Sequence, residues 1–324
     1  MKIAIIGAGI SGLVLAKHLK DNADITLFEK SGGVSGRMST RYAEDFEFDH
    51  GTQFFTARSQ MFAKFLEPLI EAGIVESWPA ALVDINGAAE VTPRDTTGLM
   101  YCGAPRMNTV GRHIIGDYPI VLRTEIDHVF RGHDKWFLKT TAGEELGPYD
   151  WVVSTAPAPQ TAKILPQEFV SANKINSVVM AGCFSLMLGL STEARPPWDG
   201  AFVHGSKIGW MAINSDKPNR KKALSLVIQS TNEWAETHME EDKARVQQEL
   251  IDEAERLLGQ TLGNAIYSSL HRWRFANVVE PMGLPYVVDP KIQLAACGDW
   301  CIKGRVEAAF ESGCNLALAI NEFI

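Results

Sequence analysis

The chain contains few cysteines, no excess of basic charge and no long apolar run. Its five cysteines lie at irregular spacings without a CxxC pair, which argues against a disulfide framework and a zinc site and favours a reducing, cytoplasmic setting. The formal net charge of −8 argues against a nucleic-acid partner. Because no stretch reaches the roughly 18 uncharged apolar residues that span a bilayer, no membrane partner is expected either.

A nucleotide-binding pattern stands at the start of the chain. Residues 2–6 (KIAII) and 24–28 (DITLF) are short apolar runs typical of buried parallel strands, and residues 11–20 carry apolar positions at helical spacing. Between the first strand and the helix, residues 7–12 (GAGISG) spell GxGxxG. The sequence therefore predicts a βαβ unit of the dinucleotide-binding type.

Each glycine of this turn has a mechanical role. Gly7 permits the tight turn, Gly9 lets a pyrophosphate approach the backbone, and Gly12 lets the helix pack closely on the strand. The helix then offers free N–H groups and its positive dipole end to the phosphates. Glu29 ends the second strand, where its carboxylate can accept hydrogen bonds from ribose hydroxyls. This pattern alone does not separate NAD from FAD.

The run EKSGGVSGRMST at residues 29–40 bears on that choice. One interpretation is a flexible surface loop, because Gly/Ser runs are often linkers. A nicotinamide dehydrogenase, however, would normally continue from Glu29 straight into its next helix. Here the glycines let backbone N–H groups approach an extended ligand, and Arg37 can bind a pyrophosphate bidentately. The run therefore favours FAD over NAD.

The rest of the chain predicts further elements in a mixed order. These are an amphipathic helix at 60–76 interrupted near Pro68, a short helix at 107–116, a β-meander over 119–155, strands over 177–230 with a hairpin at 201–214, a helix at 238–258, a strand at 292–300 and a C-terminal helix from 305.

This order predicts an α/β fold, α+β overall, with two domains. A Rossmann-type FAD-binding domain with a parallel sheet and a β-meander would be discontinuous, over residues 1–58, 102–166 and 290–324. Residues 59–101 and 167–289 would form a substrate domain on a mixed or antiparallel sheet with helices.

Three motifs together resemble the FAD-dependent amine-oxidase superfamily: GAGISGLVLAKHL, FEKSGGVSGRMST and the C-terminal CGDW…RVEAAFESG. Within it, FDHGTQFFTAR, HRWRF and the compact length are most similar to the bacterial renalase-like flavoproteins. The motifs cover both ends of the chain and the connector between them.

The resemblance implies a non-covalent FAD and a role for several residues. Ser11 and Arg37 would contact the pyrophosphate, Glu29 the ribose, the Ile126 backbone the adenine, and Asp299 a ribityl or pyrophosphate oxygen; a turn or capping role is the alternative for Asp299. The full set of expected cofactor contacts is Gly7, Gly9, Ile10, Ser11, Gly12, Glu29, Lys30, Gly36, Arg37, Met38, Gly51, Thr52, Gln53, Ile126, Gly298, Asp299, Arg305, Val306 and Glu307.

Two segments are expected beside the flavin ring. The helix that begins near Arg305 would aim its N-terminus at the flavin N1/C2 carbonyl, where a reduced flavin carries negative charge; simple packing is the alternative. In residues 48–56, Gly51 and Thr52 would let the backbone come close to the ring, and Gln53 would reach the ring or the substrate. Phe54 and Phe55 could equally pack into the core.

The resemblance also implies a reaction. Renalase-like proteins oxidise 2- and 6-dihydro isomers of NAD(P)H to NAD(P)⁺ and pass the electrons to O₂, giving H₂O₂. No HExxH, P-loop or nucleophile elbow occurs, so no metal is predicted and no catalytic side chain is assigned; the flavin carries the chemistry.

The substrate pocket is expected in the second domain. HRWR at 271–274 is a cationic strand that could meet substrate phosphates, although a surface position is the common alternative for such residues. The candidate pocket residues are Gln53, Phe54, His204, Trp210, Asn214, Gln229, His271 and Arg272.

Other functions stay open at this stage. The chain could be an amine oxidase or another FAD-dependent dehydrogenase of a small substrate, or a flavin-binding regulatory protein without turnover. The partners expected are a small-molecule substrate and O₂, and the sequence does not predict the oligomeric state.

Overall fold

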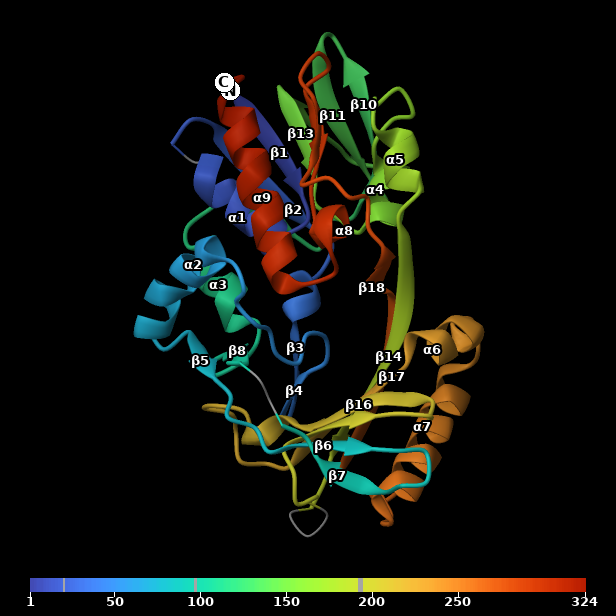
Figure 1. Ribbon diagram of the computed structural model, residues 1–324. Coiled ribbons are helices and arrows are strands. Elements are labelled where there is room, and N and C mark those ends of the chain that lie inside the picture. Colours follow the sequence, from blue (N-terminus) through green and yellow to red (C-terminus); the bar gives the residue numbers. More distant parts are fainter. Residues whose placement is uncertain (20, 96–97, 192–194) are drawn as a thin grey trace.

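The computed structural model describes residues 1–19, 21–95, 98–191 and 195–324. Lys20, the last residue of the helix predicted at 11–20, lies outside the described residues. The molecule is elongated, with one sheet toward each end and shorter elements between them (Figure 1). No helix within the described ranges is both long and apolar enough to cross a bilayer.

The first sheet has six strands in the order β19-β20-β13-β1-β2-β9, all parallel except β19. Its strands are β1 (Lys2–Ile6), β2 (Asp24–Glu29), β9 (Ile120–Leu122), β13 (Trp151–Ser154), β19 (Val287–Asp289) and β20 (Leu294–Ala296). Ile3 of β1 lies opposite Ile25 of β2 and Trp151 of β13. The central strands are apolar and buried on both faces, as a parallel sheet covered by helices requires.

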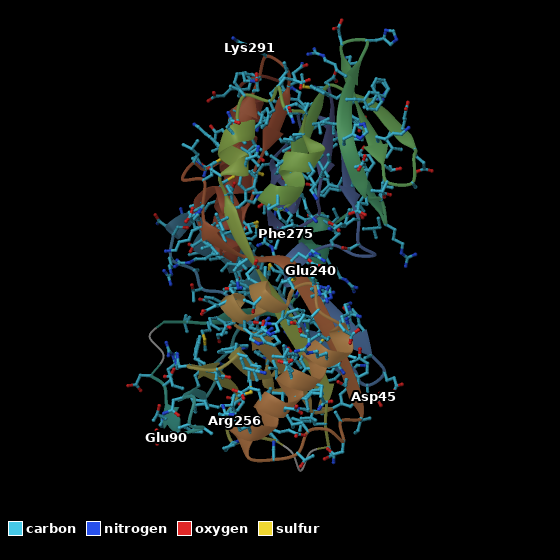
Figure 2. The ribbon with its side chains drawn as sticks, turned by 90° about the vertical axis from the view of Figure 1, so that its right-hand side faces the viewer. Asp45, Glu90, Glu240, Arg256, Phe275 and Lys291 are labelled. Atoms are coloured by element: carbon cyan, nitrogen blue, oxygen red, sulfur yellow. The ribbon has the colours of Figure 1, made fainter. Side chains whose placement is uncertain are left out.

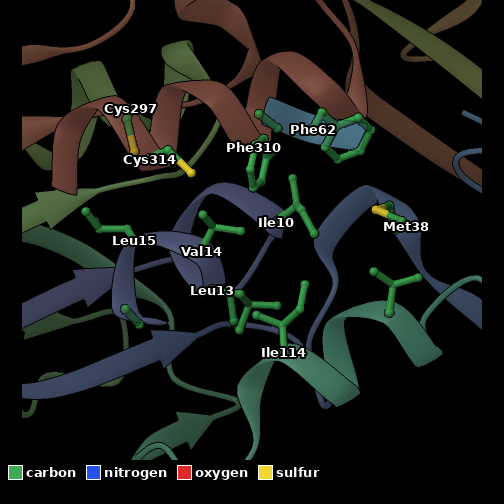
Figure 3. Close-up of a cluster of buried hydrophobic side chains, with 14 of the residues drawn as sticks. Ile10, Leu13, Val14, Leu15, Met38, Phe62, Ile114, Cys297, Phe310 and Cys314 are labelled. Atoms are coloured by element: carbon green, nitrogen blue, oxygen red, sulfur yellow. The ribbon is translucent and has the colours of Figure 1, made fainter. Parts of the chain in front are cut away.

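Successive residues of β1 face opposite sides of this sheet. On one side Ile5 packs in a cluster with α1 (Ile10–Leu19) and α9 (Val306–Asn321), the two helices seen together in Figure 3. On the other side Ile6 packs in a cluster with a three-stranded meander and α4 (Ala158–Ile164). The sheet is thus the middle layer of three, and this arrangement confirms the Rossmann-type part of the prediction.

The meander consists of β10 (Ile126–Gly132), β11 (Lys135–Thr140) and β12 (Glu145–Tyr149), and α5 (Ala172–Asn176) follows α4. The prediction started the meander at residue 119, but residues 120–122 form β9 of the parallel sheet instead. Arg123 has a φ of 56°, a left-handed conformation that ends a strand. The chain turns there and starts β10 in a different sheet.

The second sheet has seven strands in the order β18-β14-β17-β16-β15-β6-β7, and only the β6–β15 pair is parallel. Its strands are β6 (Leu82–Ile85), β7 (Val91–Pro93), β14 (Val179–Gly189), β15 (Gly200–Val203), β16 (Ile208–Ile213), β17 (Ser225–Ser230) and β18 (Tyr267–Glu280). The long pair β14 and β18 extends from this sheet toward the parallel one (Figure 1). The mixed sheet and the β15–β16 hairpin confirm the prediction.

The helix predicted at 238–258 begins later than expected. It is α7 (Lys243–Leu258), and a separate helix that was not predicted, α6 (Asn232–His238), precedes it. The Asp242 carboxylate accepts hydrogen bonds from the N–H groups of Ala244 (2.9 Å) and Arg245 (3.1 Å), which starts a new helix there. Apolar residues of α7 such as Val246 and Leu250 pack in one cluster with strands of the second sheet.

Two further boundaries differ from the prediction. The strand expected at 292–300 is only β20, because α8 (Asp299–Ile302) begins directly after Gly298. The helix expected at 60–76 is α2 (Gln60–Glu71), and Pro68 lies inside its last turn without interrupting it. Gly73, with a φ of 67°, follows the end of that helix.

Short elements connect the two sheets. They are η1 (Gly36–Met38), β3 (Thr40–Ala43), β4 (Phe46–Asp49), β5 (Val75–Ser77), β8 (Tyr101–Gly103), α3 (Thr109–Ile115) and η3 (Asn214–Asp216). The β3–β4 hairpin lies between the two ends of the molecule (Figure 1). The predicted domain bounds stay a prediction; of the strands in the parallel sheet, only β19 falls outside the segments assigned to the FAD-binding domain.

Candidate functional site

A cavity of about 1630 Å³ reaches from the glycine turn of the parallel sheet to the second sheet. At one end it is lined by Gly7, Gly9 and Glu29, and at the other by Trp210 and Gln229. It therefore has room for an extended dinucleotide and a second small molecule. Figure 2 labels Phe275, another lining residue, near the middle of the molecule.

Most residues expected to contact the cofactor line this cavity. They are Gly7, Gly9, Ile10, Ser11, Glu29, Lys30, Gly36, Arg37, Met38, Gly51, Thr52, Gln53, Ile126, Gly298, Asp299, Arg305, Val306 and Glu307. Gly12 is absent from the lining, since it packs against the turn: a Cβ there would collide with the backbone oxygen of Gly7. A Cβ on Gly9 would instead meet open space, as a position approached by a ligand requires.

Glu29 forms hydrogen bonds that hold the glycine turn in place. Its carboxylate accepts hydrogen bonds from the N–H of Ala8 (2.9 Å) and the N–H of Ser31 (2.8 Å), and the residue is only 6% exposed. It thereby joins the glycine turn to the Gly/Ser run while lining the cavity. The position agrees with a ribose contact, and the two bonds add a structural role that the sequence did not predict.

Glu29→Ala is expected to raise the Kd for FAD at least tenfold, because it removes two hydrogen bonds to a charged acceptor that shape the turn. Titration of apoprotein with FAD, followed by flavin fluorescence, measures this. Glu125→Ala is the matched control, because Glu125 also lines the cavity but is exposed. Equal flavin affinity in the two variants would contradict the role of Glu29.

Arg37 and Asp299 were assigned separate contacts, but the structure pairs them. Two guanidinium nitrogens of Arg37 donate to the two carboxylate oxygens of Asp299, at 2.6 and 2.9 Å, and one donates also to the Ala276 oxygen at 3.1 Å. This bidentate pair joins η1 to the start of α8 beside the cavity. Arg37 thus compensates a carboxylate that would otherwise repel a phosphate.

Two other residues predicted to contact the cofactor, Ser11 and Glu307, form hydrogen bonds with other parts of the protein. The Ser11 hydroxyl donates to the Ala309 oxygen at 2.7 Å and so joins α1 to α9. The Glu307 carboxylate accepts from the N–H groups of Arg58 (2.9 Å) and Ser59 (2.6 Å). Burial alone would raise the pKa of Glu307, but these two N–H groups outweigh it and lower the pKa. Both side chains therefore position the helices around the cavity.

Three aromatic rings from separate segments meet on the cavity wall. His50 lies edge-on to His271, with ring centroids 4.8 Å apart, and stacks on Trp273 at 5.3 Å. Burial, His271 and Arg41 lower the pKa of His50 to about 3, and burial, Arg41 and Lys243 lower that of His271 to about 4. Both rings are therefore neutral at pH 7. Sequence reasoning named His271 but missed His50, which lies in the segment FDHGTQFFT.

The stability of the protein is expected to fall on acidification. Below the unfolded-state pKa of about 6.5 the unfolded chain takes up protons at these histidines, whereas the folded chain does so only near their lowered pKa. Between pH 6.5 and 4 each histidine therefore lowers the free energy of unfolding by up to about 1.4 kcal/mol per pH unit. Urea denaturation at several pH values measures the slope. His271→Gln should reduce it and the exposed His133→Gln should not; equal slopes would contradict the assignment.

Three charged side chains, Asp49, Lys217 and Arg220, are buried together near the ring cluster. The Asp49 carboxylate accepts from Arg220 at 2.6 Å and Lys217 at 3.4 Å, and also from the Thr40 hydroxyl at 2.6 Å. Burial would raise the pKa of Asp49, but Lys217 and Arg220 lower it, while burial lowers the pKa of Lys217. The sequence did not predict this group, because SDKPNRKK is typical of an exposed turn.

The segment from Asp49 to Gln53 is held from several sides. Gln53 donates to the oxygens of Asp49 and Gly51, and its own oxygen accepts from Lys217 at 3.2 Å. The Gly51 oxygen accepts from Gln229 at 2.7 Å, and a Cβ on Gly51 would collide with the backbone oxygen of Arg37. The Gln53 amide is therefore positioned by the protein, although the residue lines the cavity as expected.

The predicted substrate residues divide into two groups. Gln53, Phe54, Trp210, Gln229, His271 and Arg272 line the cavity. His204 does not: its side chain is 60% exposed and its ring lies 2.7 Å from Asp84. Asn214 is fully buried, and it donates to the Glu47 oxygen at 2.9 Å and accepts from the Asp49 N–H at 3.2 Å. Its amide is thus committed to holding β4.

The arginines of the strand at 271–274 line the cavity but interact with other groups of the protein. Arg272 donates to the Glu241 oxygen at 2.6 Å and lies over the ring of Phe184. Arg274 pairs with Glu240, which Figure 2 labels near the middle of the molecule. Because successive residues of a strand point to opposite faces, His271 and Trp273 face His50 instead. Each guanidinium thus has an acceptor within the protein, and the predicted phosphate contact stays a prediction.

Comparisons with known proteins agree with this arrangement. A family model of the NAD(P)-binding Rossmann-like domain matches residues 5–69. Renalase of Mus musculus is 22% identical over 303 residues, which are 86% of this chain and 85% of the mouse protein. A 4,4'-diapophytoene desaturase of Staphylococcus aureus is 44% identical over 52 residues, only 16% of this chain and 10% of the desaturase.

Solved structures share the whole fold. A protein from Exiguobacterium sp. 255-15 assigned as a protoporphyrinogen oxidase has a TM-score of 0.79 at 12% identity, covering 99% of this chain and 98% of that one. A triple mutant of putrescine oxidase has a TM-score of 0.72 at 13% identity with the same coverage. Together with the sequence relatives, these matches support the predicted enzyme class, an FAD-dependent oxidoreductase.

Proposed function

We propose that this chain is an FAD-dependent oxidase that removes a hydride from a small electron-rich donor, and that the donor is a 2- or 6-dihydro isomer of NAD(P)H. The observation that carries the proposal is the single cavity that joins the glycine turn to a wall of uncharged aromatic rings. The product would be NAD(P)⁺, and the two electrons would pass with two protons to O₂, giving H₂O₂.

The glycine-turn end of the cavity suits the cofactor. The free N–H groups at the start of α1, the open space above Gly9 and the charge-compensated Arg37 suit a pyrophosphate, and Glu29 lies beside them for the ribose. The N-terminus of α9 also opens onto the cavity through Arg305 and Val306. Bound FAD would supply the hydride acceptor and the route of electrons to O₂.

The opposite end suits the planar, uncharged dihydropyridine ring of the donor. His50 and His271 are neutral at pH 7, and with Trp273 they present ring faces and edges to the cavity. Such rings stack on a dihydropyridine and also stabilise the nicotinamide cation that forms from it. A dihydropyridine carries its own electron pair into the reaction, so no protein base has to remove a proton from it.

Anaerobic mixing tests the proposal. Purified protein should be yellow and should lose its flavin absorbance within seconds on addition of 6-dihydro-NAD, but not on addition of β-NADH or an amine; admission of O₂ should restore the colour with one H₂O₂ per substrate. A colourless protein that binds NAD would contradict the cofactor, and a flavin that 6-dihydro-NAD leaves oxidised would contradict the substrate.

An amine oxidase is the second candidate, favoured by the shared fold with putrescine oxidase. The same experiment separates it, because bleaching would then occur with an amine. Bleaching by no reductant would instead favour a flavin-binding regulatory protein. We also propose a cytoplasmic setting, because all five cysteines are buried free thiols.

A further inference from the structure

Arg41 is a cation of the cavity wall whose side chain has no partner for its charge. Within the part of the chain that the structure describes, the Arg41 guanidinium forms no hydrogen bond and no ion pair. Its neighbours differ: Arg37 pairs with Asp299, Arg106 with Glu47, and Arg274 with Glu240. An unpaired guanidinium in a partly enclosed cavity is the group that most readily binds an anion.

The position of Arg41 places it at the substrate end. It lies on β3, opposite Phe48 of β4, and His50 follows two residues later. The hydroxyl of Ser39, two residues before Arg41, lies 3.3 Å from the ring nitrogen of His50. Both Arg41 and His50 line the cavity. The positive charge of Arg41 also lowers the pKa of His50 and of His271, in agreement with a position near both rings.

Among the described residues, no carboxylate of the lining pairs with Arg41. The acidic lining residues are Glu29, Glu125, Asp127, Asp299 and Glu307. Glu29 lies under the glycine turn, and Asp299 is bound by Arg37. Asp49 is close in sequence, but it is fully buried and bound by Lys217 and Arg220. Arg41 therefore brings a positive charge without a carboxylate partner to the neutral rings of His50 and His271.

We propose that Arg41 binds a phosphate of the substrate while the ring cluster His50–His271–Trp273 holds its nicotinamide portion. This inference rests on the proposed function and names the part of the substrate that the chain holds. A guanidinium binds phosphate bidentately and at any pH at which the protein is folded. The chain would therefore distinguish a dihydronicotinamide nucleotide from a phosphate-free dihydropyridine through one residue.

The test uses flavin-loaded protein and two reductants, 6-dihydro-NAD and 1-methyl-6-dihydronicotinamide, which lacks phosphate. In anaerobic rapid mixing, Arg41→Ala should raise the Kd for 6-dihydro-NAD about 10- to 100-fold, the loss of one charge-assisted contact, with the limiting rate of flavin reduction unchanged. The Kd for the phosphate-free compound should not change. Arg41→Lys should recover part of the affinity, because it keeps the charge but not the fork.

Two controls complete the design. Arg256→Ala removes the same charge from a surface pair with Glu253, far from Phe275 in Figure 2, and should leave both Kd values unchanged. Equilibrium titration of the oxidised protein with NAD⁺ and with 1-methylnicotinamide gives a readout without turnover, and Arg41→Ala should weaken only NAD⁺ binding.

The outcomes are distinguishable. If Arg41→Ala shifts the Kd of both reductants equally, leaves the 6-dihydro-NAD Kd within twofold of the parent, or purifies without flavin, the assignment of Arg41 to a substrate phosphate is wrong. If the unaltered protein is reduced by neither compound, the proposed function itself is wrong. In that case the titration with NAD⁺ still decides whether Arg41 binds a phosphate.

Discussion

Asp49→Ala is expected to lower the free energy of unfolding by about 3–5 kcal/mol, because it leaves two buried cations without their counter-charge. Asp49 is the only carboxylate within hydrogen-bonding distance of both Lys217 and Arg220 among the described residues, and both side chains are at most 1% exposed. Chemical denaturation of the flavin-loaded protein, followed by tryptophan fluorescence, measures the loss.

Asp84→Ala is the matched control. Asp84 also has two partners, Arg94 and His204, but all three side chains are at least 28% exposed. Surface pairs of this kind contribute about 0–1 kcal/mol. A loss of stability no greater for Asp49→Ala than for Asp84→Ala would show that the buried group does not depend on its carboxylate.

Sequence reasoning succeeds at the cofactor end of the cavity. At the cofactor end the informative residues are close together in the chain: the glycine turn, Glu29 and Arg37 all fall within residues 7–37. Their spacing within one βαβ unit is fixed by local geometry. The same holds for the parallel strands, whose apolar runs need no knowledge of distant partners.

The substrate end could not be predicted in the same way. Asp49 lies 168 residues from Lys217, and the turn that carries Lys217 and Arg220 has the composition of a solvated loop. His50 was not selected, because only the fold brings it against His271 and Trp273. The arginines of HRWR were selected for their charge, yet their direction depends on which face of β18 packs on the helices. Long-range pairing decides each of these positions.

The errors in the predicted elements have local causes that hydrophobic pattern does not reveal. Asp242 continues the polar face of a helix in sequence, but it acts as a cap and splits α6 from α7. Arg123 adopts a left-handed conformation that moves residues 120–122 into the parallel sheet. A side-chain cap in the first case and a backbone conformation in the second outweigh the periodicity around them.

Arg37→Ala should have the largest effect on the cofactor, raising the Kd for FAD by about two to three powers of ten. Part of the loss is the missing cation, a charge-assisted contact of about 1.5–3 kcal/mol. The rest arises because Asp299, only 5% exposed and lining the same cavity, would keep its negative charge without a partner. The variant should therefore purify largely without flavin and remain folded.

A double-variant cycle separates the two contributions, because Arg37 and Asp299 contact each other directly. Asp299→Asn alone should weaken FAD binding only slightly, since Arg37 then stays free for the pyrophosphate. The double variant Arg37→Ala with Asp299→Asn should bind FAD more tightly than Arg37→Ala alone, because no uncompensated carboxylate remains. Fluorescence titration of the three apoproteins gives each Kd. If Arg37→Ala retained a full complement of flavin, Arg37 would have no part in holding the cofactor, and the pair would serve only to join η1 to α8.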